Sequence, residues 1–361
     1  GSGSQVATAA GEQGLEAAAA GWEQSGAGEE PEAPAWVVAE RIPEFRAYAG
    51  LPAEADADLQ RVAVRIREEP ALLALARHCE WTVFEAPSHS PTGDWPGLEE
   101  VLGPSAGLFY LLVSFSMIPR TRQVHRDRGI PEAVTRDTCR QISCFCDNYR
   151  RFNQGRAGMP KRQIHWLRHY TCEPYVRLGR LEYWLKPDPG GVVACRNHRT
   201  EETLALAEGG KRFTDDGLLN RSPPESSGWT SSFVVEDGAI VGHPVSPLGH
   251  AFRHTITLPR NEWEIELRSG TPVLQMHIPA GGSMTPEATA ESIRRAFPFF
   301  ERYFPEEQPR AVVCSSWIFN PALETFLSPD SNLVRFLREF YLFPVPSGPQ
   351  DGLWFLFFQE S

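Results

Sequence analysis

The stretch from residue 273 to residue 293, VLQMHIPAGGSMTPEATAESI, combines the residue types most suited to chemistry. His277 lies near the end of an apolar run, Gly281 and Gly282 follow it, and Thr285 precedes a predicted helix. Glycines let the backbone approach a ligand closely, and a helix N-terminus offers unpaired N–H groups at the positive end of its dipole. The spacing therefore predicts a strand, a tight turn and a helix that together can bind a phosphate group.

A tight turn without a ligand is the competing interpretation of the same residues. Glu287 favours it, because a carboxylate in the first helical turn already occupies the favourable end of the dipole. The sequence has neither GxxxxGK[ST] nor GxGxxG, which excludes a Walker A loop and the dinucleotide-binding fingerprint. Both interpretations stay open on the residues alone.

The apolar segment 311–319 predicts a second strand, followed by a turn or helix. Its side chains alternate between two faces, with Val312, Cys314 and Ser316 on one and Val313, Ser315 and Trp317 on the other. Small polar side chains are unusual in such a strand. They fit either satisfied hydroxyls and a buried thiol in a core, or a narrow slot for a thin ligand arm.

Three histidines, His243, His250 and His254, fall in a turn-rich region that predicts a hairpin. Three imidazoles can hold zinc, but no HExxH motif or nearby fourth ligand accompanies them, so we expect no metal. They can instead line a site for an acceptor molecule.

Two arginines flank Gly179 in RLGRLEY, residues 177–183. Alternation along a continuous strand places Arg180 on the same face as Glu182. Arg180 then either pairs with a buried carboxylate or binds a substrate carboxylate through two parallel hydrogen bonds.

The composition is that of a globular protein and argues against two classes of partner. Of the 361 residues, 41% are hydrophobic and 22% are charged. The net charge of −11 argues against a general nucleic-acid binder, which needs a basic surface to displace counterions. The longest apolar run, Ala106 to Met117, is shorter than the ~20 residues of a membrane span, and we predict a buried core helix there. We therefore expect neither nucleic acid nor a membrane as partner.

The seven cysteines are odd in number and irregularly spaced. This pattern indicates reduced thiols rather than a disulfide framework. No signal-peptide pattern opens the chain. Together these observations predict a cytoplasmic protein.

The elements that position these residues change character along the chain. Residues 1–34 are poor in large apolar side chains and are predicted to form a disordered tail. Residues 35–160 show helical spacing, whereas residues 161–361 consist mostly of short β-branched or aromatic runs bounded by turn residues. Two helices are predicted among these strands, from Pro286 to about Tyr303 and from Asn332 to about Phe340. The first carries an apolar stripe expected to pack on the sheet, namely Ile293, Phe297, Phe300 and Phe304.

Seven motifs, taken in order, resemble a bacterial family of GNAT-like N-acyltransferases in which a helical N-terminal domain precedes a GNAT-like C-terminal domain. The motifs are GIPEAVTRDT (129–138), WLRHY (166–170), RLGRLEY (177–183), GHPVSPLGH (242–250), MHIPAGGSMTPEA (276–288), CSSWIFNP (314–321) and SNLVRFLREFYLFPVP (331–346). The resemblance runs from about residue 40 to the end. It implies an α/β (α+β) fold, with a mixed β-sheet and flanking helices in the second domain.

The resemblance also implies an acyl-CoA-dependent transferase that moves an acyl group directly to the amine of a small molecule or peptide, without a metal. The acyl-CoA would lie where strand 273–278 and strand 311–319 splay apart, with its pyrophosphate on the loop after the first strand. The residues implied to contact it are Ile278, Ala280, Gly281, Gly282, Ser283, Thr285, Ser315, Ser316 and Asn320. The usual Q/R-x-x-G-x-G/A loop begins with a polar or basic residue, whereas the loop AGGSMT has none, and Arg294 and Arg295 can compensate.

Roles for other side chains follow from the same resemblance. His277 would be the general base, because an imidazole titrates near neutral pH, or else only a hydrogen-bonded histidine at the end of the sheet. Tyr341 would donate a proton to the leaving thiolate, or else only pack in its aromatic neighbourhood. Candidates for the acceptor site are Arg180, His243 and His250.

Two other functions stay open at this stage. Cys314 could form an acyl-enzyme with His277 as its base, although no GxSxG elbow is present. The chain could also be a non-catalytic module that binds acyl-CoA or a peptide. The sequence leaves the acceptor amine, the acyl length and the oligomeric state open.

Overall fold

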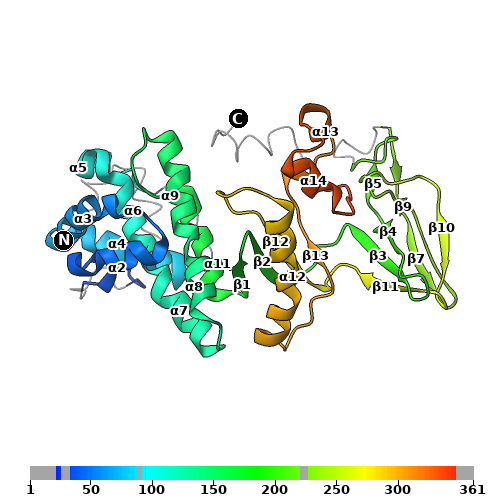
Figure 1. Ribbon diagram of the computed structural model, residues 1–361, viewed down its shortest axis with the longest axis horizontal. Coiled ribbons are helices and arrows are strands. Elements are labelled where there is room, and N and C mark those ends of the chain that lie inside the picture. The colour runs from blue at the N-terminus through cyan, green and yellow to red at the C-terminus, as the bar shows by residue number, and fades with distance from the viewer. Residues whose placement is uncertain (1–21, 26–32, 88–91, 94, 220–226, 347–361) are drawn as a thin grey trace. The chain divides into compact units, whose positions relative to one another are not determined.

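The computed structural model describes residues 22–25, 33–87, 92–93, 95–219 and 227–346. Contacts divide the chain into two units, Gly1–Glu182 with Ile278–Gly281, and Tyr183–His277 with Gly282–Ser361. Most of the predicted tail, residues 1–34, lies outside the described residues. The predicted order, a helical region followed by a mixed-sheet region with flanking helices, is confirmed (Figure 1).

The first unit is built from helices joined by short 3₁₀ turns. Its α-helices are α2 (Ile42–Ala49), α3 (Asp56–Glu68), α4 (Pro70–Phe84), α5 (Glu99–Leu102), α6 (Ala106–Ser114), α7 (Met117–Asp127), α8 (Glu132–Cys139), α9 (Gln141–Phe152), α10 (Lys161–Ile164) and α11 (His169–Cys172). In α3, Leu59, Val62 and Ile66 recur at helical spacing and are buried. Pro70 stands at the first position of α4, where its missing N–H is harmless.

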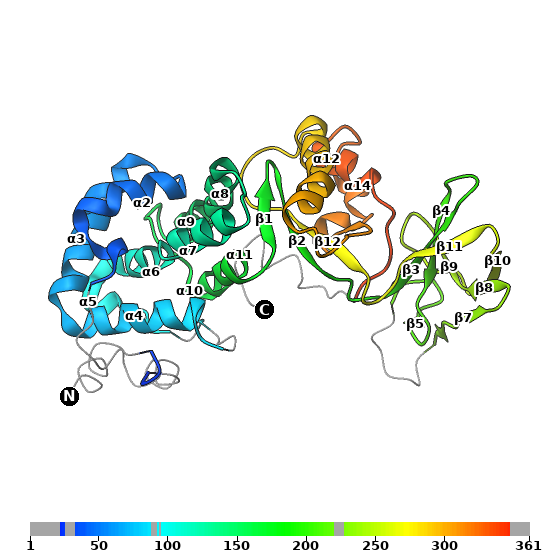
Figure 2. The ribbon, with the colours of Figure 1, turned by 90° about the horizontal axis from the view of Figure 1, so that it is seen from below.

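Helix α6 forms the centre of this unit. All nine of its residues are buried, and it packs against α3, α4 and α9 (Figure 2). The helical stretch Glu99–Asp127 around it is long and apolar enough to cross a membrane by length and composition alone. However, 78% of its most apolar window is buried inside the protein. The predicted core helix is therefore confirmed.

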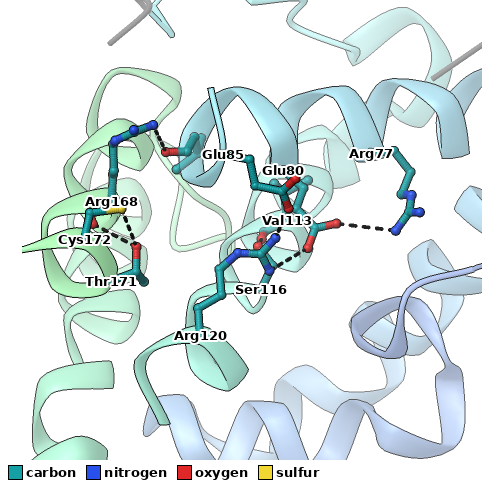
Figure 3. Close-up of polar contacts among 10 residues, drawn as sticks. Arg77, Glu80, Glu85, Val113, Ser116, Arg120, Arg168, Thr171 and Cys172 are labelled. Atoms are coloured by element: carbon teal, nitrogen blue, oxygen red, sulfur yellow. Dashed lines mark hydrogen bonds and ion pairs between the residues drawn. The ribbon is translucent and has the colours of Figure 1, made fainter. Parts of the chain in front are cut away.

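A buried carboxylate ties α4 to α7 (Figure 3). Glu80 is 8% exposed, Arg120 of α7 donates to it at 3.1 Å, and Arg77 lies 4.0 Å from it. Arg120 also pairs with Glu85. Burial raises the pKa of Glu80, and the charge of Arg120 opposes that rise. Removing one member of such a pair leaves a buried charge uncompensated, so the loss of either Glu80 or Arg120 should destabilise this unit.

The second unit contains the mixed sheet. Strands β2 (Leu181–Pro187), β12 (Pro272–His277) and β13 (Val312–Val313) are neighbours in this order. β12 and β13 run parallel, with Leu274 opposite Val312 and Gln275 opposite Val313. The preceding strand β1 (Tyr175–Leu178) belongs to the first unit and packs there against α8 and α11.

Two further sheets complete this unit. One has the order β11 (Trp263–Leu267), β3 (Val192–Asn197), β4 (Thr203–Ala207) and β9 (Pro244–Val245). The other has the order β10 (Ile256–Pro259), β8 (Ala239–Gly242) and β7 (Phe233–Glu236), and β5 (Arg212–Phe213) pairs with β6 (Trp229–Thr230). Val192 and Val193 of β3 belong to two different apolar clusters. Since alternate side chains of a strand face opposite ways, both faces of β3 are covered.

Helix α12 (Pro286–Tyr303) begins where the sequence predicts, because the Thr285 side chain accepts a hydrogen bond from the N–H of Ala288 at 3.3 Å. The predicted apolar stripe is only partly right. The buried side chains of the helix are Thr289, Ser292, Ala296, Phe299 and Phe300, whereas Ile293 and Phe297 are half-buried. Small residues at the centre of the contact face let the helix approach its neighbours, so apolarity alone did not locate that face.

The predicted strand 311–319 is wrong in its length. β13 covers only Val312–Val313, and Trp317–Phe319 forms a 3₁₀ turn. The expected alternation of Ser315, Ser316 and Trp317 on two strand faces is therefore lost. Alternating side chains permit a strand, but hydrogen bonds from a neighbour make one, and β12 pairs with this segment only at Leu274 and Gln275.

Candidate active site

The predicted strand, turn and helix are present around the glycine loop, defined here as residues 280–285 (AGGSMT). β12 ends at His277, beside the parallel strand β13. Gly281 and Gly282 have φ angles of 84° and 75°, in the left-handed region that side chains disfavour. The chain then enters α12, whose 18 residues give a well-formed N-terminus. The loop therefore leads from the end of a parallel strand to the positive end of a helix dipole.

The far end of the glycine loop is held by α14 (Asn332–Arg338). Asn332 Nδ2 donates to Ser283 Oγ at 2.8 Å, and α12 packs against α14. Ser331 caps α14 by accepting from the N–H of Val334 at 3.3 Å, so Asn332 does not serve as that cap. Met284 is buried beside these contacts. Ser283 and Met284 thus fix the approach to α12.

His277 and Gln275 share one face of β12, because alternate side chains of a strand face the same way. The His277 ring lies 6.2 Å from the ring of Trp184 on β2, and the Lys186 ammonium lies 3.9 Å from the centre of that indole. The Gln275 Oε1 is buried, and no described residue gives it a hydrogen bond. An imidazole and a buried amide oxygen therefore lie two residues apart on one face of the strand.

The contacts of Tyr341 are with β4 and β9. Its hydroxyl donates to the Val245 carbonyl and accepts from the Ala205 N–H at 3.5 Å, and its ring packs on the cluster of β3, β4 and β9. Burial raises its pKa. These contacts are those of a packed side chain, and the predicted role of Tyr341 as an acid stays a prediction.

The residues that follow β13 differ in how far they are exposed to solvent. Ser315 is exposed, and Ser316 and Cys314 are half-buried. Asn320 accepts from the N–H of Ala322 at 3.0 Å and so stabilises the turn that leads to α13 (Leu323–Phe326). Their predicted contact with a ligand arm stays a prediction.

Arg180 is not on a continuous strand, which corrects the predicted alternation. Gly179, with φ 73°, and Arg180 form the turn between β1 and β2. Arg180 Nη1 donates to the carbonyl of Pro279 at 2.9 Å. Among the described residues, no hydrogen bond joins Arg180 to Glu182. Glu182 instead accepts from a tyrosine pair, Tyr170 and Tyr175, at 2.8 Å each.

The histidines of the predicted hairpin have local partners. His243 is 7% exposed, with Ser232 Oγ 3.3 Å from Nε2 and the carbonyl of Phe252 3.3 Å from Nδ1. His250 Nδ1 lies 2.9 Å from the carbonyl of Asp216. Within the described ranges, no group of three His, Cys, Asp or Glu residues is placed to hold a metal ion. The acceptor role of His243 and His250 stays a prediction.

Family models match nearly the whole described chain. One for an N-acyltransferase N-terminal domain matches residues 40–172, and one for a GNAT-like C-terminal domain matches residues 175–361. The chain belongs to the GNAT-like N-acyltransferases. It is therefore an acyltransferase, and the interpretation as a non-catalytic binding module is set aside. Among curated proteins no sequence matches it.

Solved structures share the fold of this N-acyltransferase. An acyltransferase variant in complex with octanoyl-CoA is 21% identical, with a TM-score of 0.63 over 100% of this chain and 88% of that one. An acyltransferase in complex with decanoyl-CoA and teicoplanin is 22% identical, with a TM-score of 0.63 over 99% and 88%. At such identities the likeness establishes the common fold of the two-domain acyltransferases.

The sequence did not connect Cys144, Arg177 or Trp184 with the end of β12 and the glycine loop of this N-acyltransferase. Cys144 Sγ donates to the carbonyl of Ala280 at 3.3 Å, and Arg177 Nη1 donates to Cys144 Sγ at 3.5 Å. Trp184 lies beside His277. Cys144 belongs to the apolar stripe of α9 and lies 136 residues from its partner, so no local pattern could have revealed the contact.

Proposed function

We propose that this enzyme transfers an acyl group directly from acyl-CoA to an amine acceptor. The observation that carries the proposal is the continuous path from β12, ending at His277, through two left-handed glycines to the N-terminus of α12, beside the parallel strand β13. Backbone N–H groups and a helix dipole gathered at such a point favour a pyrophosphate.

The donor is proposed to be an acyl-CoA of medium chain length. Its pyrophosphate would lie on the glycine loop, and its pantetheine arm would follow β12 toward Ser315, Ser316 and Asn320. The support comes from the solved neighbours, whose structures contain octanoyl-CoA and decanoyl-CoA and which span 99–100% of this chain.

The chemical step assigned to His277 is proton removal from the attacking amine. The amine nitrogen forms a bond to the thioester carbonyl carbon, the C–S bond breaks, and the proton passes to the imidazole. The thiolate leaves as CoA and takes up a proton. A backbone N–H near Ile278 would stabilise the oxyanion as it forms.

The acceptor is proposed to carry its amine on a peptide-like scaffold. Two neighbours were solved with teicoplanin or an acylated teicoplanin, a glycopeptide. Arg180 is engaged by Pro279, which leaves His243 and His250 as the acceptor-site candidates for mutation. We also propose a cytoplasmic location, which the seven free thiols support.

A covalent route through Cys314 is the less favoured chemistry. Burial raises the pKa of the Cys314 thiol to about 12. A nucleophilic cysteine needs a lowered pKa, because the thiolate is the reactive form. Direct transfer needs no such group.

The test is calorimetric titration with decanoyl-CoA and acetyl-CoA, followed by CoA-release assays with a panel of peptide-like and small amines. We expect micromolar or tighter binding of at least one thioester and amine-dependent release of CoA. His277→Gln is the matched variant, which should bind the donor and turn it over slowly. Failure of the wild-type enzyme to bind either thioester would refute the proposal.

A further inference from the structure

The segment just before the glycine turn is held by side chains of the helical unit. Contacts assign Ile278–Gly281 to the first unit, apart from the strand and the helix that this segment joins. Arg180 Nη1 donates to the Pro279 carbonyl at 2.9 Å, and Cys144 Sγ donates to the Ala280 carbonyl at 3.3 Å. Two successive carbonyl groups therefore have donors from one unit.

Because the peptide unit is planar, a hydrogen bond that fixes a carbonyl group also fixes the direction of the N–H group that follows it. In a trans peptide the carbonyl and the following N–H point opposite ways. Fixing the carbonyls of Pro279 and Ala280 therefore directs the N–H groups of Ala280 and Gly281 away from Arg180 and Cys144. A Cβ placed on Gly281 would meet nothing within 4 Å, so there is open space beside the turn. Two donors are thus oriented before any anion arrives.

The holding residues are themselves braced. Arg177 Nη1 donates to Cys144 Sγ at 3.5 Å. Glu182 is 1% exposed, and the hydroxyls of Tyr170 and Tyr175 both donate to its Oε2 at 2.8 Å. The second Glu182 oxygen, Oε1, has no hydrogen-bond donor among the described residues. The buried Glu182 interacts electrostatically with both Arg177 and Arg180, which favours keeping the two guanidinium groups in this part of the unit.

We infer that Arg180 and Cys144 are positioning residues for the donor: they orient the glycine loop to receive the pyrophosphate of acyl-CoA. The inference rests on the proposed function. It assigns to residues of the helical unit a task that the loop sequence itself does not perform.

The test compares two donors that differ in the pyrophosphate. Decanoyl-CoA carries it, whereas decanoyl-N-acetylcysteamine has the same acyl thioester without it. Arg180→Met removes the guanidinium, and Cys144→Ala removes the thiol donor, while Arg180→Lys and Cys144→Ser keep a donor. Arg46→Met is the control, because Arg46 is a half-buried arginine of the same unit that pairs with Asp56 at 2.9 Å.

We expect kcat/KM for decanoyl-CoA to fall roughly 10- to 100-fold in Arg180→Met, and about two- to tenfold in Cys144→Ala, as for lost charged and neutral hydrogen bonds. The loss should fall on KM and leave kcat/KM for decanoyl-N-acetylcysteamine within about twofold. Arg180→Lys and Cys144→Ser should recover part of the loss, and Arg46→Met should treat both donors alike. If Arg180→Met does not fold, Cys144→Ala and Arg180→Lys carry the same comparison.

The outcomes separate this inference from the function beneath it. A wild-type enzyme that prefers decanoyl-CoA, with variants that retain that preference, would overturn the inference and leave the function intact. Equal losses with both donors would also overturn it, since they indicate general damage. If the wild-type enzyme shows no preference for the pyrophosphate-bearing donor, that result would contradict the proposed pyrophosphate site on the glycine loop itself.

Discussion

Replacing Gly281 by Asp and by Asn isolates the charge that the glycine loop receives. The two side chains have nearly the same shape, and both are tolerated in the left-handed region better than other residues. Gly281 has a φ of 84°, and a Cβ there meets no atom within 4 Å. Backbone strain and steric effects should therefore be equal in the two variants, and their difference reports electrostatics.

The size of the effect follows from Coulomb's law. Two unit charges about 4 Å apart repel by about 1 kcal/mol in water and about 4 kcal/mol at an effective dielectric constant near 20. Gly281 is exposed, so the lower half of this range applies. We expect decanoyl-CoA to bind Gly281→Asp roughly 10- to 100-fold more weakly than Gly281→Asn, since about 1.4 kcal/mol is tenfold.

Calorimetric titration at 0.1 M and 1 M salt measures this difference. The Debye length falls from about 10 Å to about 3 Å over that range, so the gap between the variants should shrink to a few-fold. Thermal melting of both variants checks that they fold equally well. Equal dissociation constants for Asp and Asn at 0.1 M salt would refute a pyrophosphate on this loop, and so would a gap that salt does not reduce.

Four other substitutions give distinct outcomes. His277→Gln should lower kcat by roughly 10²- to 10⁴-fold with donor affinity unchanged, as for a lost general base, and a kcat within tenfold of wild type would contradict that role. Tyr341→Phe should lower the free energy of unfolding by about 1 kcal/mol, because its hydroxyl donates to Val245, and turnover should stay within about threefold. A large loss of turnover in that variant would instead support the acid role. Cys314→Ser should retain turnover, and its loss in a folded variant would revive the acyl-enzyme route. Burial raises the pKa of Glu182 above its unfolded value, so its contribution to stability is present at low pH and lost as pH rises through the folded pKa. Glu182→Gln should therefore flatten the fall of melting temperature with pH above about 4.5, and an unchanged profile would contradict this assignment.

Local patterns predicted the elements whose cause is local. Thr285 followed by Pro286 set the start of α12, and the structure has the helix over Pro286–Tyr303. The apolar run before His277 predicted β12. Caps, proline positions and short-range periodicity act over a few residues, so they can be recognised without knowledge of the fold.

Elements that depend on a neighbour were predicted less well. The segment 311–319 alternates like a strand, yet β13 is only Val312–Val313, because hydrogen bonds from β12 extend no further. Arg180 was expected to face Glu182 along one strand, but Arg180 lies in the turn that begins at Gly179, before the strand β2 that carries Glu182. A strand's length and a turn's place depend on partners that periodicity does not reveal.

The sequence by itself determined the two-domain order, the family through its motifs, and the strand, glycine turn and helix that end in Thr285. Tertiary structure alone decided that Tyr341 hydrogen-bonds to Val245, and that Cys144 and Arg180 hold the carbonyls of the segment before Gly281. The physical reason is separation along the chain. Caps and periodicities join residues a few positions apart, whereas Cys144 and Ala280 are 136 positions apart and only the folded chain brings them together.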